Sequence, residues 1–202
     1  MCARFILIPK ELLEEIIRDI ESGTVHNAVN LMPDWPAVRR SAYPGTEVPV
    51  IVSEGSSLKP ELMNWGFSVS WTKSIVFNTR SDTAMKPGSM WADSIRSRRC
   101  VIPTLGFFES HHTQTVIDPR TSKEHKQHYL FTMPSSPVFY LAGIYEENRF
   151  SVITTDPNDS VVPIHNRMPL VLMHNELHDW LYGDYTALFE RGGIRLCAEK
   201  DV

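Results

Sequence analysis

Residues 99–110 read RCVIPTLGFFES, and this stretch decides the fold class. Apolar residues dominate it, and a carboxylate, Glu109, comes directly after the two phenylalanines. An apolar run bounded by polar residues and lacking a helical spacing is typical of a buried strand. We therefore expect a sheet to form around residues 99–110, with Glu109 at the end of one of its strands.

Further β-rich runs lie on both sides of this stretch, separated by turn-forming residues. The expected strands cover residues 2–8, 48–53, 65–69, 74–80, 128–133, 138–146 and 149–155. Leucine and isoleucine recur at helical spacing in PKELLEEIIRDIESG (9–23), which predicts one helix that stops at Gly23. Two short helices are expected at 176–183 and 185–193. Prolines predict an irregular segment over 27–46, and the polar stretch 110–127 predicts an exposed hairpin tip.

One helix, many strands and then small helices indicate an α+β fold with a mainly antiparallel, barrel-like β core and flanking helices. A chain of 202 residues with 42% hydrophobic residues is long enough to bury one substantial core. We therefore expect a single domain over residues 1–202. Neither a run long enough to span a membrane nor a signal peptide is visible in the sequence, so we expect a cytoplasmic protein without membrane contact.

The charge and the cysteines exclude several classes of protein. The formal net charge of -4 is opposite in sign to that of a protein that coats nucleic acid indiscriminately. Any nucleic-acid binding must be local, and arginine groups that could line one groove are Arg39 and Arg40, Arg96, Arg98 and Arg99, and Arg80 with Arg167. Three widely spaced cysteines without a CxxC pair predict neither a disulfide framework nor a structural zinc site.

Cys2 directly follows the initiator methionine, and a small second residue permits removal of Met1. The product carries an amine and a thiol on adjacent carbons. With ordinary pKa values of about 7.7–8.0 for an α-amine and about 8.5 for a thiol, both groups have a nucleophilic fraction near neutral pH. Such a pair condenses with an aldehyde, first to an imine and then to a five-membered thiazolidine.

Three more segments place polar groups next to expected strands. Asn78 and Arg80 follow one β-rich run, where an amide and a guanidinium suit phosphate or sugar binding. Glu109 follows the apolar run 99–108, where burial would raise its pKa and make it a proton carrier. His165 and Arg167 lie between apolar residues in IHNRMPL (164–170). Taken singly, Glu109 also reads as a surface carboxylate and His165 as a structural histidine.

In this order the segments resemble the SRAP family, the SOS-response-associated peptidases. The similarity rests on Met1-Cys2-Ala3-Arg4-Phe5, Pro44-Gly45-Thr46, Trp65-Gly66, the NTRSDT motif from Asn78 to Thr83, the segment from Arg99 to Glu109, and Ile164-His165-Asn166-Arg167-Met168-Pro169. It spans most of the chain.

The resemblance implies a protein of the DNA-damage response that bonds covalently through Cys2 to abasic sites in single-stranded DNA. It implies that Glu109 assists removal of Met1 and moves protons, and that His165 helps to open the deoxyribose ring. Residues expected to contact DNA are Arg4, Ser41, Pro44, Trp71, Asn78, Arg80 and Arg167, with Trp71 as a wedge or stacking residue. No cofactor, metal or protein partner is implied, and we expect a monomer that associates with the nucleoid when bound to DNA.

This chain departs from the family pattern at three positions near these residues. Ala3 stands where glycine is usual. Ser41 stands where asparagine is common, and its side chain is shorter. Ser110 replaces the aromatic residue that often follows the catalytic glutamate.

Two alternatives use some of the same residues. A cysteine-dependent peptidase would use Cys2, Glu109 and His165. A metal-binding module would use His111, His112, His125 and His128, which flank a polar tip but lack a partner cysteine or carboxylate pattern.

Overall fold

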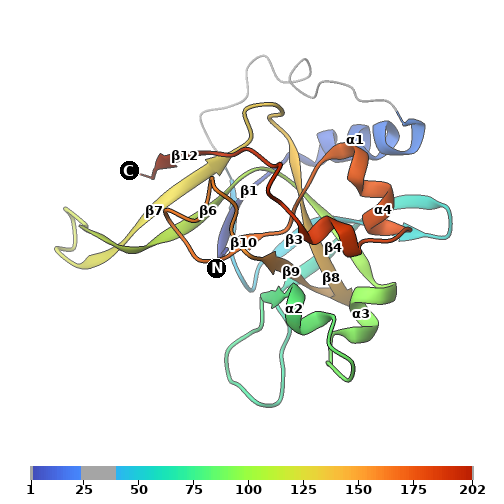
Figure 1. Cartoon of the computed structure of the whole chain (residues 1–202), viewed down its shortest axis with the longest axis horizontal. Coiled ribbons are helices and arrows are strands. Elements are labelled where there is room, and N and C mark those ends of the chain that lie inside the picture. Colours follow the sequence, from blue (N-terminus) through green and yellow to red (C-terminus); the bar gives the residue numbers. More distant parts are fainter. Residues whose placement is uncertain (1, 24–39, 202) are drawn as a thin grey trace.

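A computed structural model describes residues 2–23 and 40–201, without the side chains of residues 10 and 11 (Figure 1). The strands are β1 (Arg4–Leu7), β2 (Ser41–Ala42), β3 (Glu47–Glu54), β4 (Ser57–Trp65), β5 (Asn78–Arg80), β6 (Arg99–Ile117), β7 (Glu124–Thr132), β8 (Phe139–Glu146), β9 (Arg149–Thr155), β10 (Met168–Pro169), β11 (Val171–Leu172) and β12 (Cys197–Lys200). The helices are α1 (Lys10–Ser22), α2 (Ser81–Ala84), α3 (Ala92–Ser97) and α4 (Leu177–Leu181), with the 3-10 helices η2 (His174–Glu176) and η3 (Thr186–Phe189). Among these residues, no helix has the length and apolar character needed to cross a membrane.

Helix α1 forms where the leucine and isoleucine spacing predicts it. Leu12, Leu13, Ile16 and Ile17 are buried on one face of the helix, where they belong to a core that also includes residues of α4 and of the sheet. Gly23 ends the helix with a φ of 66°, and its N–H donates to the carbonyl oxygens of the last turn. A left-handed conformation at this position favours glycine, which explains why the helix stops there.

Strand β6 is the centre of the sheet, because it pairs in antiparallel fashion with β1, β3, β7 and β8. The sheet is mixed, since β9 pairs in parallel with both β4 and β5. Strand β8 pairs with β6 and with β9, so the ladder through β8, β9, β4, β3 and β6 returns to its start. The expected α+β class, with mostly β structure and few helices, is confirmed. The barrel-like shape stays a prediction.

A second core lies among the strands themselves, and Trp65 is its largest fully buried side chain. Its ring centroid lies 4.6 Å from that of Phe5 and 6.2 Å from that of Phe150. The indole N–H donates to the Phe77 carbonyl oxygen over 2.8 Å, so the polar atom of this buried side chain has a partner. Cys2 belongs to the same core.

Some elements differ from the sequence-based expectation. The strand expected at 65–69 ends at Trp65 and instead begins at Ser57, because Gly66 turns the chain with a φ of 120°. The stretch 110–127 is largely strand: β6 continues to Ile117 and β7 begins at Glu124, which makes a hairpin that extends from the body (Figure 1). Residues 27–39 of the expected irregular segment lie outside the described residues.

Gly66→Ala should destabilise the protein more than Gly55→Ala. Both glycines have positive φ, but an added Cβ at Gly66 would lie 2.9 Å from Ile75 Cδ1. An added Cβ at Gly55 would have no heavy atom within 4 Å. The positive φ alone costs about 1 kcal/mol, and the overpacking adds about 1–3 kcal/mol. Urea unfolding of the two variants and of wild type measures each free energy of unfolding. Equal losses in the two variants would show that Ile75 does not constrain Gly66.

Candidate active site

Cys2 lies in the core at the point where the chain enters β1. Strand β1 pairs with β6 so that Arg4 is opposite Phe108 and Phe5 is opposite Phe107. Cys2 is fully buried, and its thiol makes a long contact of 3.6 Å with the Arg4 carbonyl oxygen. The Asn78 Nδ2 atom, at the start of β5, donates to the Cys2 carbonyl oxygen over 2.8 Å. The backbone of Cys2 is therefore held by a residue of β5, a strand far from it in the sequence.

Glu109 lies on β6 and is only 2% exposed. The His165 Nε2 atom lies 3.9 Å from Glu109 Oε2. Burial raises the pKa of the Glu109 carboxyl from 4.5 to about 7, because the interior disfavours the charged form. Glu109 is therefore close to half ionised at neutral pH, and it can both accept and donate a proton there.

Burial also favours the neutral forms of the two neighbours of Glu109. The pKa of the Cys2 thiol is raised, first by burial and then by the negative charge of Glu109. The pKa of the His165 imidazole is lowered, mainly by burial. At neutral pH the thiol is thus protonated and the imidazole is neutral, so Glu109 is the group among these three that titrates in the physiological range.

The segment between β9 and β10 positions His165. The His165 N–H donates to the Val161 carbonyl oxygen over 2.9 Å, and the His112 N–H of β6 donates to the Ile164 carbonyl oxygen over 2.9 Å. The His165 Nδ1 atom faces the backbone of Arg167, with the carbonyl oxygen at 3.0 Å and the N–H nitrogen at 3.1 Å. The ring is held from the Nδ1 side, and Nε2 points toward Glu109.

The structure therefore brings together four residues predicted from the sequence: Cys2, Asn78, Glu109 and His165, which we name the Cys2 cluster. Their chemical roles stay predictions.

The three arginines expected to contact DNA lie outside the Cys2 cluster, and each is paired with an aspartate. Arg80 makes two hydrogen bonds to Asp82, of 3.0 and 2.8 Å. Arg167 donates to Asp156 Oδ1 over 2.5 Å and to the Thr154 carbonyl oxygen over 2.8 Å.

Arg4 reaches in another direction. Its Nη1 atom donates to Asp201 over 2.6 Å and its Nε atom to Ser41 Oγ over 3.2 Å. Its guanidinium also lies 3.7 Å from the centroid of the Phe108 ring. Arg4 therefore links Ser41 to Asp201, the residue that follows β12.

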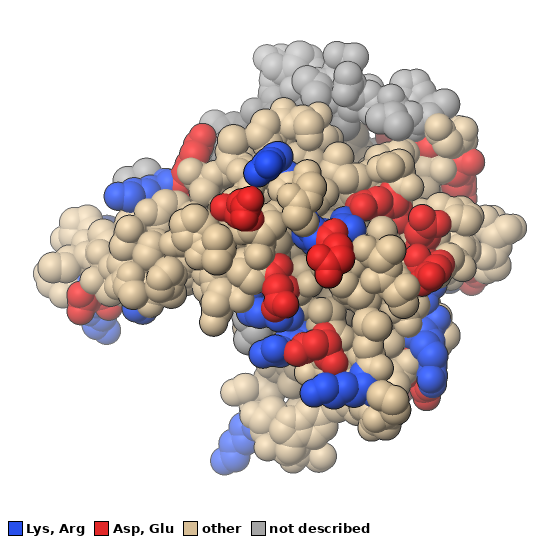
Figure 2. Space-filling model, in the orientation of Figure 1, with Lys and Arg blue, Asp and Glu red and all other residues tan. Residues whose placement is uncertain are grey.

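The group Arg96, Arg98 and Arg99 does not form an open basic groove. Arg99 is buried and donates to backbone carbonyls of Ile95, Arg96 and the α4 region. Arg98 is paired with Glu146, and Arg96 with Asp93. Figure 2 shows lysine and arginine interspersed with aspartate and glutamate over one face of the molecule. Arg39 lies outside the described residues.

Pro44 and Trp71 belong to two exposed loops. Pro44 lies in a turn closed by the Thr46 N–H, which donates to the Tyr43 carbonyl oxygen over 3.1 Å. Trp71 lies in the loop between β4 and β5 and is 62% exposed, an unusual exposure for a large aromatic residue. No interaction with the Cys2 cluster is recorded for either side chain among the described residues.

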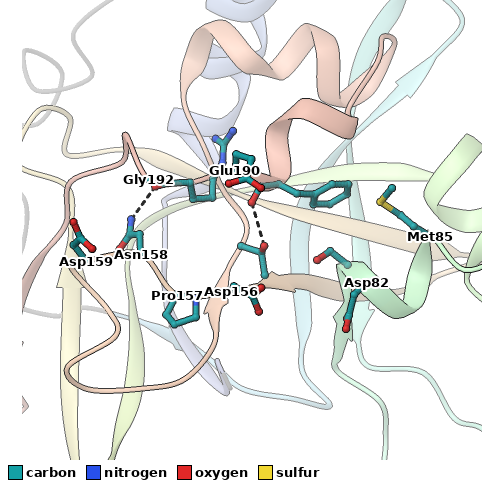
Figure 3. Close-up of a pocket in the computed structure, with 12 residues that line it drawn as sticks. Asp82, Met85, Asp156, Pro157, Asn158, Asp159, Glu190 and Gly192 are labelled. Atoms are coloured by element: carbon teal, nitrogen blue, oxygen red, sulfur yellow. Dashed lines mark hydrogen bonds between the residues drawn. The ribbon is translucent and has the colours of Figure 1, made fainter.

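A cavity of about 460 Å³ is lined in part by Asp82 and Asp156, the partners of Arg80 and Arg167 (Figure 3). Its walls come from α2, from the segment after β9 and from the segment after η3. They include four acidic residues: Asp82, Asp156, Asp159 and Glu190. Sequence reasoning singled out none of these for binding, because their proximity results from the tertiary fold and not from a local motif.

The histidines of the metal-binding alternative lie on the β6 and β7 hairpin. The His111 and His112 rings stack at 4.7 Å, and the His125 and His128 rings lie 6.3 Å apart. Within residues 2–23 and 40–201, no group of three or more histidine, cysteine or acidic residues is arranged to hold a metal ion.

Comparison with known proteins identifies relatives that share the description abasic site processing protein. The abasic site processing protein YoqW of Bacillus subtilis is 27% identical over 199 residues, covering 90% of this chain and 80% of that protein. The abasic site processing protein YoaM of the same organism is 26% identical over 195 residues, covering 90% and 79%. A crystal structure of a protein from Bacteroides thetaiotaomicron has a similar fold, with a TM-score of 0.66 and 22% identity over 98% of this chain and 91% of that one.

A family model described as SOS response associated peptidase (SRAP) matches residues 1–191. This match covers every residue of the Cys2 cluster and nearly all of the chain, and the chain therefore belongs to the SRAP family.

Proposed function

We propose that this protein bonds covalently, through Cys2 as its first residue, to abasic sites in single-stranded DNA. The observation that carries the proposal is the Cys2 cluster, in which a buried cysteine at the chain start lies beside a carboxyl whose pKa is about 7. The names of the relatives YoqW and YoaM, both abasic site processing proteins, agree with this substrate.

The chemistry requires that Met1, which lies outside the described residues, is removed. The freed α-amine of Cys2 then attacks the aldehyde carbon of the open-chain abasic deoxyribose, and loss of water gives an imine. The Cys2 sulfur bonds to the imine carbon while its proton is transferred to nitrogen, which closes a thiazolidine ring. One water is released in total, and no oxidant or reductant is needed.

Glu109 is suited to move the protons in these steps. Its carboxylate form accepts a proton from the amine or thiol, and its acid form returns it to the departing water. His165, whose imidazole lies 3.9 Å from Glu109, would assist opening of the sugar ring. Asn78 fixes the Cys2 carbonyl, which orients the amine and the thiol toward one side of β1.

Arg4, Arg80 and Arg167 would hold the DNA backbone around the lesion, because guanidinium groups bind phosphate oxygens at a fixed register. Ser41 and Pro44 would contact the same strand. A formal net charge of -4 gives no overall basic field to open a duplex, and unpairing a base costs a few kcal/mol; on the face shown in Figure 2 the two signs of charge are interspersed. Single strands and strand junctions are therefore the expected substrates.

Cys2→Ser should abolish the heat-stable adduct with abasic single-stranded DNA. The variant retains an amine that forms an imine, but its hydroxyl closes the ring poorly, so borohydride should trap the imine. Cys197→Ser, at an exposed cysteine, is the matched control and should crosslink like wild type. The measurement is denaturing gel electrophoresis with mass spectrometry of the N-terminus.

A Cys2→Ser protein that crosslinks as stably as wild type without borohydride would refute the thiazolidine. An intact Met1 in fully crosslinking wild type would refute it as well. If the protein is instead a peptidase that uses Cys2, wild type and Cys197→Ser should cleave fluorogenic peptides, and Cys2→Ser should not.

The crosslinking rate of wild type should rise between pH 6 and pH 8, as Glu109 with its pKa of about 7 becomes ionised. Glu109→Gln should be slower by about 100-fold at pH 7.5, the lower part of the range for a lost general base. Its remaining rate should follow the titration of the α-amine alone. Single-turnover rates on protein that begins at Cys2, verified by mass, give the test.

An unchanged shape of the pH profile in Glu109→Gln would show that another group titrates. If Glu109 also assists removal of Met1, the variant should retain more Met1 than wild type under the same expression.

Trp71→Ala should slow crosslinking about tenfold where the lesion adjoins paired bases, because stacking on an aromatic residue is worth about 1–3 kcal/mol per base. Trp71→Phe keeps an aromatic face and should retain most of the rate. Time courses on matched single-stranded and partly paired abasic oligonucleotides measure both effects. Equal rates for Trp71→Ala and Trp71→Phe on the junction substrate would remove Trp71 from the DNA path.

A further inference from the structure

The pairing of Arg167 with Asp156 is unlike an ordinary surface ion pair. Arg167 is 8% exposed, with Nη2 bonded to the Thr154 carbonyl oxygen and Nη1 to Asp156 Oδ1. The Asp156 side chain, in contrast, is 90% exposed. An exposed carboxylate therefore covers the donor of a buried guanidinium.

Arg80 and its partner are arranged differently. The side chains of Arg80 and Asp82 are 54% and 50% exposed, and Asp82 accepts from Nε and Nη2. The other donors of Arg80 are not bonded to any described residue, so a phosphate can approach them while Asp82 stays in place. Arg167 is more enclosed than Arg80: it is 8% exposed, each of its Nη nitrogens already donates one hydrogen bond, and its Nε is buried.

The two pairs are close enough to influence each other. The charge of Arg167 acts on Asp82, and that of Asp156 acts on Arg80. These two arginines and two aspartates together carry no net charge. A DNA strand that approaches this edge therefore does not meet the field of two free arginines.

We infer that Asp156 occupies the position of a DNA backbone phosphate on Arg167, and that the phosphate must displace it. The inference rests on the proposed function and adds a residue that sets specificity. Asp156 weakens reversible binding to undamaged single strands, so that the covalent bond at Cys2, and not phosphate affinity, retains the protein on DNA. A carboxylate and a phosphate offer the same acceptor oxygens to a guanidinium, which makes the exchange chemically matched.

Displacement of Asp156 requires little rearrangement. Its side chain is already mostly in solvent, and it lines the cavity of about 460 Å³ (Figure 3). Asp159 and Glu190 line the same cavity. Rotation of one exposed side chain uncovers Nη1, whereas the hydrogen bond of Nη2 to Thr154 keeps the guanidinium in place.

The test is reversible binding of undamaged single-stranded DNA to Asp156→Asn, measured by fluorescence anisotropy over a series of salt concentrations. Asparagine keeps the shape and removes the charge, so binding at low salt should tighten about tenfold. Both proteins make the same phosphate contact once Asp156 has moved, so the tightening comes from the lost competition and repulsion of the carboxylate, which salt screens. The gain should therefore shrink as salt is raised.

Two further variants separate competition from other causes. Asp159→Asn removes the same charge three residues away, from an exposed residue that makes no recorded contact with Arg167, and it should change affinity less than twofold by screened electrostatics. Asp156→Glu keeps the charge and should bind like wild type. Equal tightening in Asp156→Asn and Asp159→Asn, or in Asp156→Asn and Asp156→Glu, would overturn the inference. So would an Asp156→Asn protein with unchanged affinity at low salt.

The readout does not depend on Cys2, because undamaged strands offer no aldehyde. Failure of wild type to crosslink abasic DNA, together with the predicted Asp156→Asn effect, would contradict the covalent proposal alone. Normal crosslinking with no Asp156→Asn effect would contradict the displacement alone.

Discussion

The antiparallel pairing of β1 with β6 carries the first residues of the chain into the core, and the geometry of the candidate site depends on it. Phe5 faces Phe107 and packs against Trp65, so the register is fixed by large buried side chains and not by a loop. A shift of one residue would send these side chains to the opposite face of the sheet. The same register determines how far Cys2 lies from Glu109. Cys2, two residues before β1, is thereby held within a core cluster.

Burial and charge pairing act together to keep the region almost neutral. Inside, low polarity favours a protonated thiol, a neutral imidazole and a carboxyl that is poised near neutral pH. At the edge, aspartates balance the arginines. The region therefore combines a buried carboxyl with a pKa near neutrality and an edge at which each arginine is paired with an aspartate, which agrees with the proposed action on a lesion and not on a sequence.

Local patterns predicted much of this architecture. Helix α1 follows from leucine and isoleucine spacing and from Gly23, and the apolar run 99–108 with its terminal Glu109 indicated the central strand. The beginning of β4 was missed because Lys59, Pro60 and Glu61 interrupt the apolar pattern, and that strand is specified by its pairing with β3. The cluster of Asn78, Glu109 and His165 around Cys2 was expected only through the family resemblance. The pairing of Asp156 with Arg167 could not be predicted from the sequence, because it results from the tertiary packing of the segment after β9.

The partners of Cys2 are distributed along almost the whole chain, and this has a consequence for how the protein matures. The Asn78 amide lies 76 residues downstream, Glu109 and His165 follow later, and Arg4 is paired with Asp201, 197 residues away. During synthesis the N-terminus emerges first, yet the strands that enclose it emerge afterwards, and closure of such distant contacts is slow. Cys2 therefore spends the period of translation in an open chain that enzymes acting on nascent N-termini can reach. Folding then encloses Cys2 only after the strands that surround it have been made.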